Sequence, residues 1–243
     1  MAPDEPSHLM ERASLALEAM DYLACEALCL EALRLARSSA DWALYARVLL
    51  PLQESRRQRR LIAAEGPILL GTAAPVSQAA IAGLRAGCVV LSAPLGPAQA
   101  LALHREARAA HRHIEVLYAS HAPGLGPWRL SPYTGLQTDC VRPAPEPDLT
   151  HRPLDPATDP AAHRRAASWF LAASEALGDA ACAAALARVG ASSPAQRVAA
   201  LEEALHAVDS HELLHQALWS AAREAQMSQA QPVTAAHRAG GAR

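Results

Sequence analysis

The sequence predicts an α/β protein in which a small three-stranded parallel βαβαβ unit lies between N- and C-terminal helical hairpins. Three short apolar runs rich in branched or aromatic residues, at positions 68–70, 88–91 and 114–118, predict the strands. The Ala-rich segments between them, 76–85 and 97–111, are long enough to cross back over a sheet. Parallel strands joined by right-handed crossovers are therefore expected.

The first 65 residues are predicted to form an N-terminal helical arm. Apolar residues recur there at spacings of three and four, which is typical of helices with one buried face. Asp41 follows a short polar boundary and is expected to cap a helix. Pro51 falls inside that helix, so we expect a kink or a break near Leu50.

Residues 66–135 are assigned to the central unit together with a Pro-rich cover, and residues 136–159 to a linker. Half of the 18 prolines lie between positions 122 and 160, which disfavours regular structure in that segment. Trp128 and Tyr133 favour a cover that packs onto the domain as far as Gly135.

Residues 160–227 are predicted to form C-terminal helical hairpins, and residues 228–243 a disordered tail. Helix starts are expected at Asp159, Ser193 and Asp209, and helix ends at Gly178 and Gly190. The short connections between these helices predict antiparallel neighbours.

In two stretches, a turn is followed by small residues at helical spacing. They are Met20-Asp21-Tyr22 followed by Cys25, Cys29, Ala32 and Leu33, and the turn 176–179 followed by Ala183 and Ala187. This partial pattern, found in the flanking segments only, resembles the turn and second helix of a tetratricopeptide-type repeat. The resemblance implies stacked helical hairpins that form grooves for peptides or partner helices.

Charge and cysteine content limit the binding partners and the cellular compartment that we expect for the chain. A formal net charge of -2 over 243 residues predicts no overall attraction for nucleic acid or for an anionic membrane. The sequence shows no apolar run of about 20 residues and no basic leader, so we expect a cytoplasmic protein. The five cysteines are scattered and odd in number, which is typical of reduced thiols.

The most basic stretch of the chain is Arg-Arg-Gln-Arg-Arg at 56–60. It has two interpretations, a contact for phosphate or an acidic partner, and a solvated helix end with positive charge near the terminal carbonyls. We favour the solvated helix end.

The string HELLH at 211–215 matches HExxH, in which two histidines one turn apart bind zinc. By resemblance to zinc metalloproteases, His211 and His215 would be the ligands and Glu212 the general base. Asp209 stands where that family prefers an uncharged residue, and the extended motif with a third histidine is missing. We therefore expect the match to be accidental, and predict no metal and no other cofactor.

A second candidate site lies at the carboxyl ends of the predicted strands, where parallel sheets bind ligands. The residues there are Gly71, Thr72, Ser92, Ser120 and His121. Their hydroxyls, imidazole and backbone N–H groups suit a small anion. The alternative is that the sheet is a spacer between helical arms, and we prefer that alternative.

Protein interaction or assembly is the leading functional prediction, through a protein partner or through self-association, without nucleic acid or membrane as partner. The alternative is a small-ligand-binding protein or an enzyme that uses the carboxyl edge of the sheet. A zinc hydrolase built on HELLH is a less favoured third.

Overall fold

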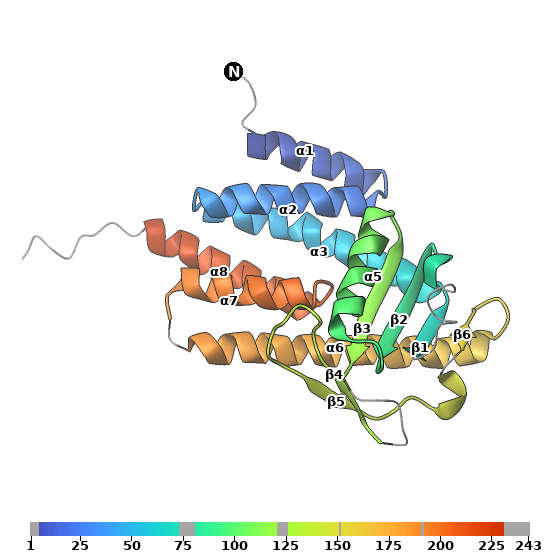
Figure 1. The fold of residues 1–243 in the computed structure, drawn as a ribbon. Helices are drawn as coiled ribbons and strands as arrows, with labels where there is room; N and C mark the ends of the chain where they lie inside the picture. The colour runs from blue at the N-terminus through green and yellow to red at the C-terminus, as the bar shows by residue number, and fades with distance from the viewer. Residues whose placement is uncertain (1–4, 73–80, 121–125, 151, 191, 231–243) are drawn as a thin grey trace, which may run out of the picture.

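The structure is a computed structural model that describes residues 5–72, 81–120, 126–150, 152–190 and 192–230. Its α-helices are α1 (Glu5–Glu18), α2 (Tyr22–Ser38), α3 (Trp42–Glu65), α5 (Pro97–Ala109), α6 (Pro160–Val189), α7 (Pro194–Ala207) and α8 (Glu212–Ala230). Its strands are β1 (Ile68–Thr72), β2 (Ala86–Ser92), β3 (His113–Ala119), β4 (Trp128–Leu130), β5 (Cys140–Arg142) and β6 (Pro153–Leu154), with a short 3-10 helix at Pro147–Leu149. Helices and a mixed sheet together make an α/β fold (Figure 1).

Local capping chemistry begins several of the helices where the sequence predicts. The side chains of Asp41 and Asp159 each accept a hydrogen bond from the backbone N–H three residues on, at 2.9 and 3.1 Å. Ser193 and Gln196 form a capping box at the start of α7. These short-range bonds use residues that are neighbours in the chain, so the predicted starts are confirmed.

Two helices are longer than the sequence predicts. α3 continues through Pro51, so the helix does not break near Leu50, and α6 continues through Gly178, where we wrongly expected a turn between two helices. Gly178 lies inside α6 with the ring of His211 against it, and a β-carbon there would be 2.2 Å from the ring. Glycine therefore permits a close approach at this position instead of ending the helix.

The sheet has six strands in the described residues, in the order β5-β4-β3-β2-β1-β6. β1, β2 and β3 pair in parallel, and β4, β5 and β6 pair antiparallel to their neighbours. The predicted three-stranded sheet was thus too small. The connection from β1 to β2 passes through 73–80, which lie outside the described residues, so the βαβαβ unit stays a prediction.

The segment predicted to be a linker, 136–159, contributes β5 and β6 to the two edges of the sheet. Leu149 and Leu154 of this segment are buried, and Leu154 pairs with Ile68 of β1. The Nε1 of Trp169 also donates a hydrogen bond to the Pro143 carbonyl at 2.9 Å. These apolar anchors hold the Pro-rich chain against the domain, so the linker interpretation is wrong.

Helices cover both faces of the sheet. α3 and α6 pack on one face and α5 on the other (Figure 1). Successive strand residues point to opposite faces. Cys88 and Val90 enter the large core shared with the helical arms, whereas Val89 and Leu91 enter a smaller core beneath α5.

The N-terminal arm, α1 to α3, and the C-terminal arm, α6 to α8, pack together through α3 and α8 (Figure 1). Arg60 of α3 adds an ion pair to Glu175 of α6. The arms therefore form one body beside the sheet. The end of α8 at Ala230 lies past the start of the predicted tail at 228, and residues 231–243 are outside the described part.

Among the described helices, α6 has the length and apolar composition of a membrane-crossing helix, contrary to our reading of the sequence. This is weak evidence for a membrane span, because the core helix of a protein can have the same properties. α6 packs against α7, α8 and the sheet.

Candidate functional site

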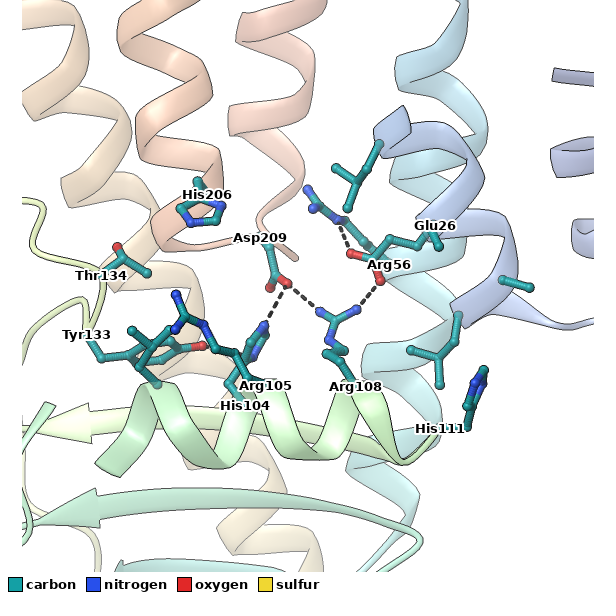
Figure 2. A pocket seen from close by; sticks show the side chains of 15 residues that line it. Glu26, Arg56, His104, Arg105, Arg108, His111, Tyr133, Thr134, His206 and Asp209 are labelled. Atoms are coloured by element: carbon teal, nitrogen blue, oxygen red, sulfur yellow. Dashed lines mark hydrogen bonds and ion pairs between the residues drawn. The ribbon is translucent and has the colours of Figure 1, made fainter. Parts of the chain in front are cut away.

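Two adjoining hollows lie between the helical arms. The first, of about 460 Å³, is bounded by α2, α5 and the connection between α7 and α8 (Figure 2). The second, of about 360 Å³, continues between α2 and α7 over α3 and α8. Leu30, Arg56 and His206 line both hollows, so we treat the two as one interarm groove.

Aliphatic side chains form much of this groove. Leu23, Ala27 and Leu30 of α2 make one wall, and Leu52 and Leu218 lie in the floor. The opposite wall is α7, with Leu205 and His206. Leu30 is 44% exposed, so apolar surface remains open to an occupant.

A buried network of ion pairs lies at the inner end of the groove. Glu26 of α2 accepts hydrogen bonds from Arg56 at 2.8 Å and from Arg59 at 2.6 Å, both on α3. Arg108 of α5 also donates to Glu26 (Figure 2). One carboxylate thus joins three helices.

The network extends from Glu26 to the sheet and to the C-terminal arm. Arg59 donates to Glu115 of β3 at 2.8 Å, and Arg108 donates to Asp209 at 2.5 Å. Arg56, Arg59 and Arg108 therefore face three carboxylates. Charge balance matters here, because a buried charge without a partner costs several kcal/mol.

The pKa values of the carboxylates reflect these surroundings. Burial alone would raise the pKa of Glu26, but Arg56, Arg59 and Arg108 outweigh burial and lower it to about 2. Burial would also raise the pKa of Asp209, but the positive charge of Arg108 outweighs burial and lowers it. The pKa of Glu115 is raised, because its burial outweighs the attraction of Arg59.

His104 of α5 lies between Tyr133 and Asp209. Its Nδ1 is 3.1 Å from the Tyr133 hydroxyl, and its Nε2 is 3.8 Å from Asp209 Oδ2. Burial lowers the pKa of His104, although Asp209 partly opposes the shift. A neutral ring with Nε2 protonated accepts the tyrosine hydroxyl hydrogen and turns its N–H toward the carboxylate. This arrangement fixes Tyr133 at the closed end of the groove.

The geometry favours binding over chemistry. Glu26 and Asp209 are held by arginines and serve to join the arms to α5 and the sheet. What remains for an occupant is the aliphatic wall, together with Arg105 and His206, which are exposed and line the groove. Figure 2 places Arg105 on α5 and His206 on the opposite side of the first hollow.

Comparisons with family models, with curated proteins and with solved structures each return no match. The resemblance to tetratricopeptide-type repeats therefore stays a prediction, and the groove has to be interpreted from its own residues.

The predicted ligand site at the sheet edge is separate from the groove. Thr72 and Ser92 end β1 and β2, and Ser120 follows β3, so these residues are at the same edge. Gly71 lies at an irregularity in the β1–β2 pairing, with a φ of 72°. His121 and the Thr72 side chain are outside the described part, so this site is untested.

The two serines of that edge have different surroundings. Ser92 is fully buried, and its Oγ has no hydrogen-bond partner among the described residues. Ser120 Oγ donates a hydrogen bond to the Arg129 carbonyl at 3.2 Å. Neither serine lines the interarm groove.

The HELLH residues take structural positions. His211 precedes α8, its Nδ1 accepts a hydrogen bond from the Leu214 N–H, and its Nε2 is 3.2 Å from Asp179 Oδ1. His215 Nε2 donates to the Asp209 carbonyl at 3.1 Å. In the described residues, no group of three or more His, Cys, Asp or Glu side chains is arranged to hold a metal ion.

The predicted helix cap at Asp209 is wrong. The Asp209 carboxylate pairs with Arg108, α8 begins at Glu212, and the Nδ1 of His211 accepts the N–H of Leu214 in the first turn. Long-range charge pairing thus overrides the local capping preference. Glu212, the first residue of α8, is exposed.

The sequence interpretation also missed the buried arginines. Arg56 and Arg59 were assigned to a solvated helix end, but both are buried in the network. Their spacing with Arg60, at i, i+3 and i+4, places the three on one helix face, while Arg57 is exposed. That spacing is the available signal, because their partners lie 30 and 56 residues away in the chain.

Proposed function

We propose that the chain is a protein-interaction module whose interarm groove binds an amphipathic helix of a partner protein. The observation that carries the proposal is the open aliphatic wall of α2 facing α7 across two adjoining hollows. A helix usually turns polar residues away from its buried face. α2 buries Cys25, Cys29 and Ala36 on its core face, yet turns apolar residues toward the groove as well.

The spacing of that wall suits a helical occupant. Leu23, Ala27 and Leu30 follow one another at i, i+4 and i+7, which makes a ridge along one face of α2. Such ridges pack into the grooves of a second helix. The floor from Tyr45 to Arg56 of α3 extends about 16 Å, room for roughly three helical turns.

The rest of the fold has a supporting role in this proposal. The predicted βαβαβ unit acts as a spacer, with α5 closing one end of the groove. The tetratricopeptide-like hairpins supply the two walls, and such stacked hairpins are suited to holding peptides. No step of catalysis is required.

The test is selection from a display library of amphipathic peptides of about 14 residues, long enough to form a helix on the surface. We expect selected peptides to bind the parent and to lose binding to a Leu30→Arg variant. Leu186→Arg is the matched control, because Leu186 is 42% exposed and outside the groove. Peptides that bind both variants equally would contradict the groove.

Self-association is a separate outcome of the same experiment. Sedimentation of the parent and of Leu30→Arg over a range of concentrations would reveal it. A dimer that dissociates in Leu30→Arg, but not in Leu186→Arg, would place a second copy of this chain in the groove instead of a foreign helix.

A further inference from the structure

We infer that the partner helix is acidic, and that one of its carboxylates pairs with Arg105 at the end of the groove closed by α5. This inference rests on the proposed function and adds the chemistry of the partner and the residue that selects it. It is argued from the charges along the groove and from which of them already have partners.

The groove is more positive than the chain that carries it. Five arginines line it, at positions 34, 37, 56, 105 and 108, against three carboxylates, at positions 26, 202 and 209. The difference, 5 minus 3, is +2 with histidines neutral, whereas the whole chain has a formal charge of -2. A surplus of this sign inside a hollow draws in anionic groups.

The three carboxylates of the groove are already engaged. Glu26 and Asp209 belong to the buried network, and Glu202 accepts a hydrogen bond from the Tyr45 hydroxyl at 2.7 Å and lies 3.4 Å from Arg37. They therefore offer little to a cationic partner. A lysine-rich helix would meet arginines whose counter-charges are already used.

The groove arginines differ in whether they already have a carboxylate partner. Arg56, Arg108 and Arg37 each face a carboxylate of the groove, and Arg34 pairs with Glu31 beside it at 2.6 Å. Arg105 is exposed, and within the described part of the chain no hydrogen bond or ion pair joins its guanidinium to another residue. It is the groove arginine left for an incoming carboxylate.

The position of Arg105 gives the interaction a direction. It lies on α5 between His104 and Arg108, across the first hollow from His206 (Figure 2). An acidic side chain near one end of the bound helix would reach Arg105 while the apolar face lies on Leu23 and Leu30. A bidentate arginine–carboxylate pair then sets the orientation of the helix as well as its charge.

The experiment uses two synthetic peptides of about 14 residues that share one leucine pattern and carry either glutamate or lysine on the remaining helix faces. Fluorescence anisotropy measures their dissociation constants with the full chain and with Arg105→Glu. Arg12→Glu is the control, because Arg12 is an exposed arginine of α1 outside the groove and the change in net charge is the same.

We expect the glutamate peptide to bind the parent about tenfold or more tightly than the lysine peptide. Arg105→Glu should weaken the glutamate peptide by about tenfold and reduce the preference, while Arg12→Glu changes it by less than about twofold. Because Arg105 is exposed, Arg105→Glu should leave the unfolding curve of the protein unchanged. That curve is the check that the variant is folded.

The contrary results separate the two proposals. Equal binding of both peptides, lost in Leu30→Arg and unaffected by Arg105→Glu, would overturn the acidic partner and leave the groove standing. Failure of both peptides to bind, together with failure of the library selection, would overturn the groove and with it this inference.

Discussion

The imidazole of His211 lies against the backbone of Gly178, so that a β-carbon at Gly178 would be 2.2 Å from the ring. The contact joins the start of α8 to the middle of α6. His211 is fully buried, with Glu175 and Asp179 of α6 at 3.3 and 3.2 Å from its Nε2. One glycine therefore determines how closely two helices of the C-terminal arm can pack.

Gly178→Ala should destabilise the protein although alanine favours helix. The gain in helix propensity is about 1 kcal/mol, whereas forcing a methyl group into the His211 ring costs about 1–3 kcal/mol or more. We expect a net loss of about 1–2 kcal/mol in the free energy of unfolding, measured by urea denaturation.

His211→Ala provides the control for that substitution. In this background the ring is gone, so Gly178→Ala should become neutral or stabilising, and the double-mutant cycle should give a clear coupling between the sites. An unchanged penalty in the His211→Ala background would contradict the contact.

Glu26→Gln should be among the most damaging single substitutions in the chain. It removes the shared partner of Arg56, Arg59 and Arg108 and leaves buried positive charge without compensation. Breaking a buried ion pair from one side costs about 3–5 kcal/mol. Glu31→Gln is the control, because Glu31 forms an exposed ion pair with Arg34 on the same helix. It should have no measurable effect on urea unfolding.

Stability should decrease as pH falls below neutrality. Burial, with Arg56 nearby, lowers the pKa of His215 from 6.5 to about 3, so between these values the unfolded chain binds more protons and unfolding is favoured. Glu26 adds to the loss below pH 4.5, as the pH approaches its folded pKa of about 2. The raised pKa of Glu115 opposes these effects.

His215→Gln tests the histidine part of that pH dependence. Between pH 7.5 and 5.5 the buried neutral ring should cost the parent about 1.4 kcal/mol of unfolding free energy, and the variant should lack this decrease. Parallel slopes for parent and variant over this range would show that His215 titrates normally in the folded protein.

The HELLH string should bind no zinc. The Nδ1 of His211 accepts a hydrogen bond from the α8 backbone, its Nε2 lies beside Asp179 of α6, and the Nε2 of His215 donates to the Asp209 carbonyl. We expect the purified chain to contain no stoichiometric zinc and its melting temperature to be unchanged by a chelator. One zinc per chain, with a large fall in melting temperature on chelation, would contradict this expectation.

Features that depend on neighbours in the chain could be predicted from the sequence, and features that depend on distant contacts could not. Asp41, Asp159 and Ser193 begin helices through bonds to residues three positions on. β6 could not be predicted, because a two-residue strand beginning with proline pairs only where Ile68 of β1 lies beside it. Gly178 has the signature of a helix end, but it lies inside α6, where the ring of His211 leaves no room for a β-carbon.

In the candidate site too, local features could be predicted and long-range contacts could not. The arginines at 56, 59 and 60 share a helix face, which could be predicted, but their carboxylate partners come from α2, β3 and α6. The groove arises where two arms far apart in the sequence meet, so Leu30 and His206 carry no local signal of facing one space. The sheet edge could be located from strand ends alone, while its use as a site stays untested.

The most direct test of the central claim is to map the bound peptide by amide chemical shifts of the full chain. Addition of a library-selected peptide should shift the resonances of the groove walls, around Leu23, Leu30 and Leu205, and leave the sheet edge at Ser92 and Ser120 unchanged. Shifts confined to that sheet edge, with the groove walls unaffected, would contradict the account.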